Sequence, residues 1–255
     1  MHELLYRAAP EAVFGYFVLF CRMGAAFMAM PAIGESYFPV RVRLAFAVLC
    51  ALCVYPGVAP ILPKEPPLFS DAFLLLAHEI IAGVLIGYIV KIFHAVVHLS
   101  GSIISYQAGL TAAMLFDPSQ ASTGTVVGNF LGIATLALLF SANVHHLFIR
   151  AAAESYAAIP PGGVSDKADA LVPALLDVAS GAFRVAVSFS MPFMAVGLIG
   201  YLTLGIMGRL MPQMQVFFVV VPLQIVVVLG MVGMALVTLM PWLIDRYYEL
   251  MENMV

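Results

Sequence analysis

Long runs of apolar residues, separated by short polar stretches, make up most of the chain. At about 1.5 Å per residue, a helix needs about 20 apolar residues to cross a bilayer. Each run therefore predicts a helix that crosses or deeply enters a membrane. The clearest runs are Ala12–Pro31, Leu44–Leu62, Ala72–Phe93, Gly124–Ala142, Val185–Met207 and Val216–Ile244.

The separating stretches are rich in proline and glycine, which favour turns. They cover Gly34–Arg43, Pro63–Asp71 and Pro160–Asp177. No convincing internal repeat connects the runs. The pattern predicts an all-α, polytopic hydrophobic protein.

The stretch Ser100–Gln120 fits neither class, because serine, glutamine, glycine and threonine are mixed with its apolar residues. Polar backbone at membrane depth is tolerated where it is buried in protein or lines a watery cavity. One interpretation is a re-entrant or pore-facing element. The other is a moderately polar span packed among neighbouring helices, and composition alone does not separate them.

Composition excludes several classes of function. Of the 255 residues, 63% are hydrophobic and 10% are charged, against roughly 45–50% and about 25% in soluble domains. Little length remains for a separate soluble catalytic domain. The net charge is −3 and no basic cluster occurs, so nucleic acid is not an expected partner.

The positions of Lys and Arg do not predict which side of the membrane each loop faces. Cytoplasmic loops of membrane proteins usually carry the excess of Lys and Arg. Here these residues are spread over almost every connection, so no arrangement of the runs collects them on one side. A simple up-and-down topology is therefore not expected, and broken or re-entrant helices are favoured.

Apparent metal motifs in the chain are incomplete. His78 and Glu79 begin an H-E-x-x-H pattern, but Ala82 stands where the second histidine ligand belongs. His145 and His146 are adjacent, and neighbours on a helix point about 100° apart. The three cysteines lie in apolar runs and are interpreted as buried thiols. We expect no catalytic residue, no metal site and no cofactor.

Arg22 and Glu79 lie inside apolar segments, and Arg184 directly precedes the segment Val185–Met207. An uncompensated charge at the centre of a membrane helix costs at least about 2.5–3.5 kcal/mol. These side chains must therefore face protein or water. Either they form buried pairs between helices or subunits, or they line a polar pathway or proton relay.

Glycines at four-residue spacing lie on one face of a helix and let another backbone approach closely. Gly83 and Gly87 form one such pair, and Gly124, Gly128 and Gly132 form a longer series. Both predict tight helix packing.

Taken together, these residues resemble the FliR family of flagellar biosynthesis proteins, whose relatives serve in virulence-associated type III secretion. The most specific stretch runs from Gly205 to Gln213 and continues to Pro222; its family motif residues here are Arg209, Pro212, Gln213 and Pro222. A second match runs from Gly101 to Pro118. Weaker matches are Arg22 with Pro31, Pro39 with Arg43, Pro56, and Glu79 with Gly83 and Gly87.

The resemblance implies a FliP-like part over about residues 1–170 and a FliQ-like helical hairpin over about residues 171–255, within one membrane-protein domain. The family forms a helical, partly extramembrane assembly, which would account for the scattered positive charge. It also implies that the polar stretch is a channel plug. The candidate plug residues are Tyr106, Gln107, Gly109, Asp117 and Pro118.

The function implied is a non-enzymatic structural and gating subunit of the export gate in the bacterial inner membrane, at the flagellar basal body. Expected partners are FliP-like and FliQ-like subunits, FlhB-like and FlhA-like components, unfolded export substrates and membrane lipid. No phosphate-binding loop G-x-x-x-x-G-K-[ST] occurs, so energy would come from other components. The alternative is a stand-alone secondary transporter of small solutes that uses Arg22, Glu79 and Arg184.

Overall fold

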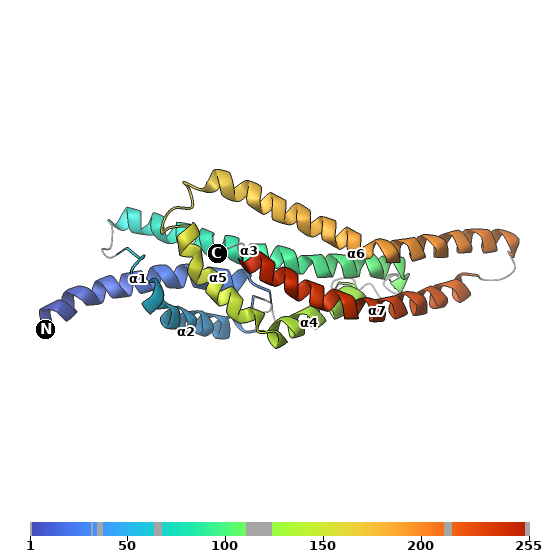
Figure 1. Ribbon diagram of the computed structural model, residues 1–255, viewed down its shortest axis with the longest axis horizontal. Coiled ribbons are helices and arrows are strands. Elements are labelled where there is room, and N and C mark those ends of the chain that lie inside the picture. Colours follow the sequence, from blue (N-terminus) through green and yellow to red (C-terminus); the bar gives the residue numbers. More distant parts are fainter. Residues whose placement is uncertain are drawn as a thin grey trace. The chain divides into compact units, whose positions relative to one another are not determined.

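A computed structural model describes residues 2–31, 33–34, 38–63, 68–110, 124–211 and 216–252. Within these ranges the chain is helical and contains no strand (Figure 1). The prediction of an all-α polytopic protein is confirmed. The helices are α1 (His2–Ala29), α2 (Val40–Val58), α3 (Phe69–Gln107), α4 (Val126–Ser141), α5 (Val144–Ala158), α6 (Ala168–Leu210) and α7 (Phe217–Glu252).

Several of these helices can cross a membrane. Among the described residues, five are long and apolar enough to do so, and the bent pair of α4 and α5 would make a sixth span. The bend follows Ser141, and Asn143 has the left-handed φ of 58° that ends one helix before the next begins. A broken helix was expected, but α5 was not among the predicted apolar segments.

The described helices α3 and α6 are longer than the runs that predicted them. The run Ala72–Phe93 lies within a helix of 39 residues, and Val185–Met207 lies within one of 43. Polar side chains in α3 bond to their own helix, as Ser102 does to the carbonyl of His98 at 2.9 Å. This satisfies the hydroxyl without interrupting the helix.

The chain forms two compact units, which we call unit 1 and unit 2. Unit 1 comprises Met1–Ile92, Phe140–Val178 and Arg246–Val255, and unit 2 comprises Phe93–Leu139 and Ala179–Asp245. Leu19, Met23 and Phe27 of α1 are fully buried in unit 1; Ile104, Leu131 and Phe193 are fully buried in unit 2. The division at about residue 170 into FliP-like and FliQ-like parts stays a prediction.

Candidate functional site

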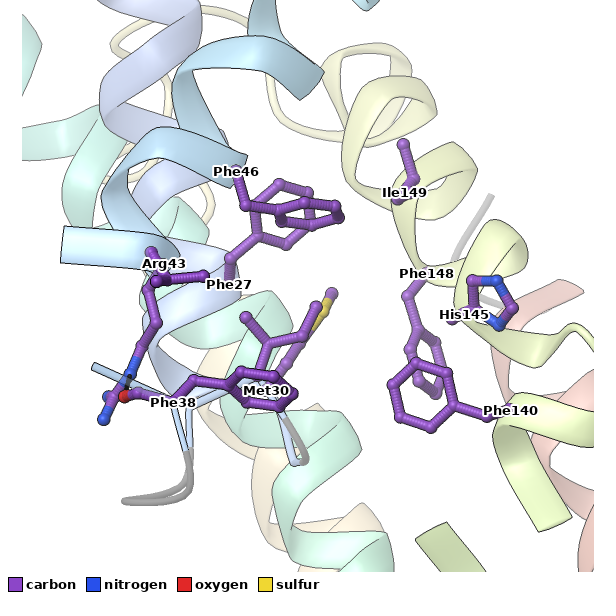
Figure 2. Close-up of a pocket in the computed structure, with 11 residues that line it drawn as sticks. Phe27, Met30, Phe38, Arg43, Phe46, Phe140, His145, Phe148 and Ile149 are labelled. Carbon is purple, nitrogen blue, oxygen red and sulfur yellow. Dashed lines mark hydrogen bonds between the residues drawn. The ribbon is translucent and has the colours of Figure 1, made fainter. Parts of the chain in front are cut away.

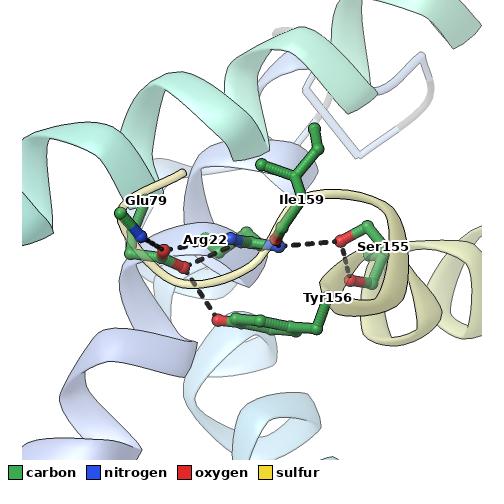
Figure 3. A network of polar contacts seen from close by, with 7 residues as sticks. Arg22, Glu79, Ser155, Tyr156 and Ile159 are labelled. Carbon is green, nitrogen blue, oxygen red and sulfur yellow. Dashed lines mark hydrogen bonds and ion pairs between the residues drawn. The ribbon is translucent and has the colours of Figure 1, made fainter. Parts of the chain in front are cut away.

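A fully buried ion pair joins α1 to α3 in unit 1 (Figure 3). Arg22 Nε donates to Glu79 Oε2 at 2.7 Å, and Arg22 Nη2 donates to Glu79 Oε1 at 3.0 Å. Both side chains have 0% of their surface exposed. This two-bond geometry is the strongest arrangement available to an arginine and a carboxylate.

Residues from α5 and the turn after it complete the network. Arg22 Nη1 donates to Ser155 Oγ at 3.2 Å and to the carbonyl of Ile159 at 2.9 Å. The Tyr156 hydroxyl donates to Glu79 Oε2 at 2.9 Å, and the Gly162 amide donates to Glu79 Oε1 at 3.2 Å. The guanidinium carbon of Arg22 also lies 3.7 Å from the centre of the Tyr156 ring. The charges are thus matched by hydrogen bonds and by a cation–π contact.

This saturation favours a structural role for the pair. Each oxygen of Glu79 accepts two hydrogen bonds, one of them from Arg22. A carboxylate held in this way has its hydrogen bonds supplied by fixed neighbours and has few free lone pairs for another partner. Of the two interpretations of Arg22 and Glu79, the geometry fits the buried pair between helices better than the proton relay.

Two glycines of α3 allow this pair to form. A Cβ atom added at Gly83 would lie 2.1 Å from the carbonyl oxygen of Arg22, and one at Gly87 would lie 2.5 Å from that of Ala26. Both distances are far below van der Waals contact. The backbones of α1 and α3 therefore touch along the face that carries Glu79, as four-residue glycine spacing predicts.

In the series Gly124, Gly128 and Gly132, the last two glycines lie at a helix contact and the first does not. Gly128 and Gly132 lie in α4: a Cβ added at Gly101 of α3 would come 2.4 Å from the Gly128 Cα, and one at Gly132 would come 2.5 Å from His98 Nε2. Gly124 precedes α4, and its φ is 81°. Its expected place on the packing face is therefore wrong: it supplies left-handed backbone before the helix.

Gly128→Leu is expected to impair packing of α4 on α3 and to lower recovery of the folded protein in detergent several-fold. Even a Cβ at this position would lie 2.6 Å from Thr125 Oγ1 and 3.2 Å from the His98 carbonyl. Overpacking of a close contact typically costs about 1–3 kcal/mol. Monodisperse recovery can be followed by size-exclusion chromatography. Recovery equal to wild type would contradict the assignment.

The end of α3 is anchored by amides in unit 2. The Gln224 Nε2 amide donates to the Gln107 carbonyl, and Gln224 is buried. A Cβ at Gly197 would lie 2.1 Å from Gln107 Oε1, and one at Gly200 would lie 2.5 Å from Gln224 Oε1. Glycines of α6 thus make room for two amide side chains, a contact that no spacing in the sequence indicates.

The described part of the polar stretch is helix followed by a turn. Ser100 and Ser105 are buried and bonded within unit 2, to the carbonyl of Val96 and to the amide of Val127 respectively. The surroundings of Ser100 and Ser105 fit the interpretation as a packed span. Tyr106 is exposed, and Gly109 has the left-handed φ of 74°. Asp117 and Pro118 lie outside the described residues.

Arg184 differs from the other two charges, because its side chain is exposed on α6. The chain by itself does not bury this arginine, so its assignment as a buried charge is wrong for the single chain. Hydrophobicity marks a charge as costly but does not tell whether its own chain or another covers it. Compensation by a partner subunit stays a prediction.

Unit 1 also holds an apolar cavity of about 220 Å³, which no pattern in the sequence indicates (Figure 2). Phe27 and Phe46 lie on one side with ring centres 5.3 Å apart, and Phe140, His145 and Phe148 lie on the other. At its edge, Arg43 donates to the carbonyls of Phe38 and Gly34 at 2.9 and 3.0 Å. This lining suits an apolar group. Among the described residues no cluster of three His, Cys, Asp or Glu could hold a metal ion.

Comparison with known proteins decides the family. The sequence profile of "Bacterial export proteins, family 1" matches residues 13–251. The chain belongs to this family. Flagellar biosynthetic protein FliR of Caulobacter vibrioides is 34% identical over 92% of this chain and 93% of its own length. The FliR proteins of Bacillus subtilis and Escherichia coli are 29% and 26% identical, over 83% and 94% of this chain and 82% and 92% of their own lengths.

The family match covers both units and includes Arg22, Glu79, Gly83 and the glycines of α4. The predicted resemblance to FliR is therefore confirmed. In the strongest motif, Arg209 is exposed in the last turn of α6, and Pro222 lies inside α7. Pro212 and Gln213 of the same motif lie outside the described residues.

Proposed function

We propose that this chain is a structural and gating subunit of a bacterial flagellar protein-export gate in the inner membrane. In this role it would assemble with FliP-like and FliQ-like subunits and help to conduct unfolded export substrates. FlhB-like and FlhA-like components would lie next to the assembly, in the basal body. The observation that carries the proposal is the similarity to flagellar biosynthetic proteins along nearly the whole chain.

The surface of the described helices supports an assembly. Large apolar side chains are exposed along α2, α6 and α7, well beyond those that a monomer in water tolerates. Leu49, Leu202 and Val237 are 60%, 58% and 76% exposed. Lipid or other subunits must cover these faces.

The buried ion pair also supports a scaffold rather than a solute carrier. A carrier that used Arg22 and Glu79 would need them to release and rebind an ion during transport. Here both are saturated by fixed neighbours on α5 and the following turn. The pair instead fixes three segments of unit 1 in one arrangement.

Co-purification tests the proposal. The tagged chain, expressed with the FliP-like and FliQ-like subunits of the same bacterium, is expected to elute with them as one stable complex in mild detergent. Deletion of the gene should abolish swimming and the export of flagellar subunits. A monomer that elutes alone and transports a small solute after reconstitution would instead support the secondary transporter.

Deletion of residues 111–122 tests the plug assignment. If this segment helps to close the channel, the deletion is expected to leave the complex intact and to raise passive leakage of ions or small solutes. Conductance of reconstituted complexes measures that leakage. An assembled deletion complex with wild-type leakage would refute the plug, whereas loss of the complex would show that the segment packs a rigid core.

A further inference from the structure

A groove between α6 and α7 in unit 2 combines an arginine with hydroxyl and apolar side chains. Its volume is about 370 Å³. Arg184, Ser188 and Phe189 line it from α6, and Thr238, Leu239 and Trp242 line it from α7. Trp242 is the only tryptophan of the chain and is 41% exposed. A half-exposed tryptophan beside an arginine is a combination enriched at the energetic centres of protein interfaces.

Arg184 brings a positive charge into this groove, and none of the described residues that line it is acidic. No ion pair joins it to any residue that the structure describes. It lies within a helix that is apolar enough to cross a membrane, where an unpaired arginine is energetically costly. An anion placed against the guanidinium would remove most of this cost.

We propose that this groove receives a helix of a partner subunit that presents one Asp or Glu side chain from an otherwise apolar face. The carboxylate pairs with Arg184 and accepts a hydrogen bond from Ser188, while apolar neighbours of that acidic residue pack on Leu239 and Trp242. This inference rests on the proposed function and adds to it the chemistry of one subunit contact.

The residues of the groove favour a protein carboxylate over a lipid phosphate. Phe189 and Leu239 give the groove apolar walls on both helices. A helix that carries a single carboxylate fills the polar and the apolar parts of such a groove together. Polar side chains between membrane helices form hydrogen bonds across the helix interface and help to hold the helices together.

The test uses the complex of this chain with its FliP-like and FliQ-like partners. A photoreactive amino acid at position 188 is expected to cross-link to an apolar partner helix that contains an Asp or Glu. Arg184→Glu is expected to lower recovery of the complex at least tenfold, whereas Arg184→Lys should keep at least half of it. Replacement of the cross-linked carboxylate by Lys should then restore recovery of Arg184→Glu.

Arg41→Glu is the matched control, since Arg41 is an exposed arginine in the first turn of α2, outside the groove, and its reversal changes the net charge equally. It should leave recovery unchanged. Cross-linking to lipid alone, wild-type recovery of Arg184→Glu, or failure of the reversed pair to restore recovery would each overturn the inference. If the wild-type chain forms no complex with these subunits, the proposed function itself fails, which is a separate outcome.

Discussion

Replacement of Glu79 by alanine is expected to prevent accumulation of the folded chain and to abolish swimming. The change leaves the Arg22 guanidinium fully buried without its counter-ion and leaves the Tyr156 hydroxyl and Gly162 amide without their acceptor. Removal of one partner of a buried pair costs about 3–5 kcal/mol. That is a large fraction of the stability of about 5–15 kcal/mol typical of a folded protein.

Thermal unfolding in detergent and the steady-state amount in membranes measure the effect. Arg150→Ala is a matched control: it breaks the ion pair with Glu154 on α5, in which the arginine side chain is 69% exposed. Exposed pairs contribute about 0–1 kcal/mol, so this variant should resemble wild type. Equal stability of Glu79→Ala and Arg150→Ala would contradict the structural role of Arg22 and Glu79.

The double variant Arg22→Met/Glu79→Leu separates loss of charge pairing from loss of packing. Apolar residues of similar volume can replace a buried pair with little loss of stability, because neither charge then has to be desolvated. We expect the double variant to be less damaging than Glu79→Ala, although it also removes the bonds to Ser155 and Ile159. A double variant less stable than Glu79→Ala would show that these bonds matter more than the unpaired charge.

Hydrophobic patterning was sufficient to predict the class of fold and to single out Arg22 and Glu79. It could not predict that they bond to each other, because the two residues are 57 positions apart and meet only when α1 packs on α3. Ser155 and Tyr156 were missed altogether. They lie on α5, a short helix with polar as well as apolar residues, so the search for long apolar runs did not find it.

Four-residue spacing did not predict the role of every glycine in the second series. Gly124, Gly128 and Gly132 look equivalent in sequence, yet the first precedes α4 and has a positive φ. Conversely, Gly101 and Gly197 belong to no obvious series, but Gly101 lies against another backbone and Gly197 lies against the side-chain amide of Gln107. Small-residue spacing predicts close approach only where the helix boundaries are already known.

Composition likewise did not predict whether the polar stretch lines a pore or packs against neighbouring helices. The serines on α3 left a watery lining and a packed span open, and three of them bond within unit 2, to carbonyls, to a backbone amide or to a hydroxyl. In a membrane helix a serine can satisfy itself on the preceding turn, so its presence does not identify a pore. Only the neighbours supplied by the fold distinguish the two cases.

Gly83→Ala is expected to destabilise the chain as strongly as many substitutions in a protein core, although it adds only a single methyl group. Alanine usually stabilises a helix by about 0.8–1.0 kcal/mol relative to glycine. Here the new Cβ would lie 2.1 Å from the Arg22 carbonyl oxygen and 2.9 Å from the Ala25 Cβ. The first neighbour is backbone and cannot move by a change of rotamer, so α1 has to move away from α3.

That movement also weakens the ion pair, because the displaced backbone belongs to Arg22 itself and Glu79 lies one helical turn before Gly83. Gly57→Ala is the matched control in the same unit, since nothing lies within 4 Å of a Cβ added there. It should be as stable as wild type or slightly more so. The double variant Gly83→Ala/Glu79→Ala should lose less unfolding free energy than the sum of the losses in the two single variants. Both single variants already disrupt the contact between Arg22 and α3. Fully additive losses would mean that the glycine contact and the ion pair stabilise unit 1 independently.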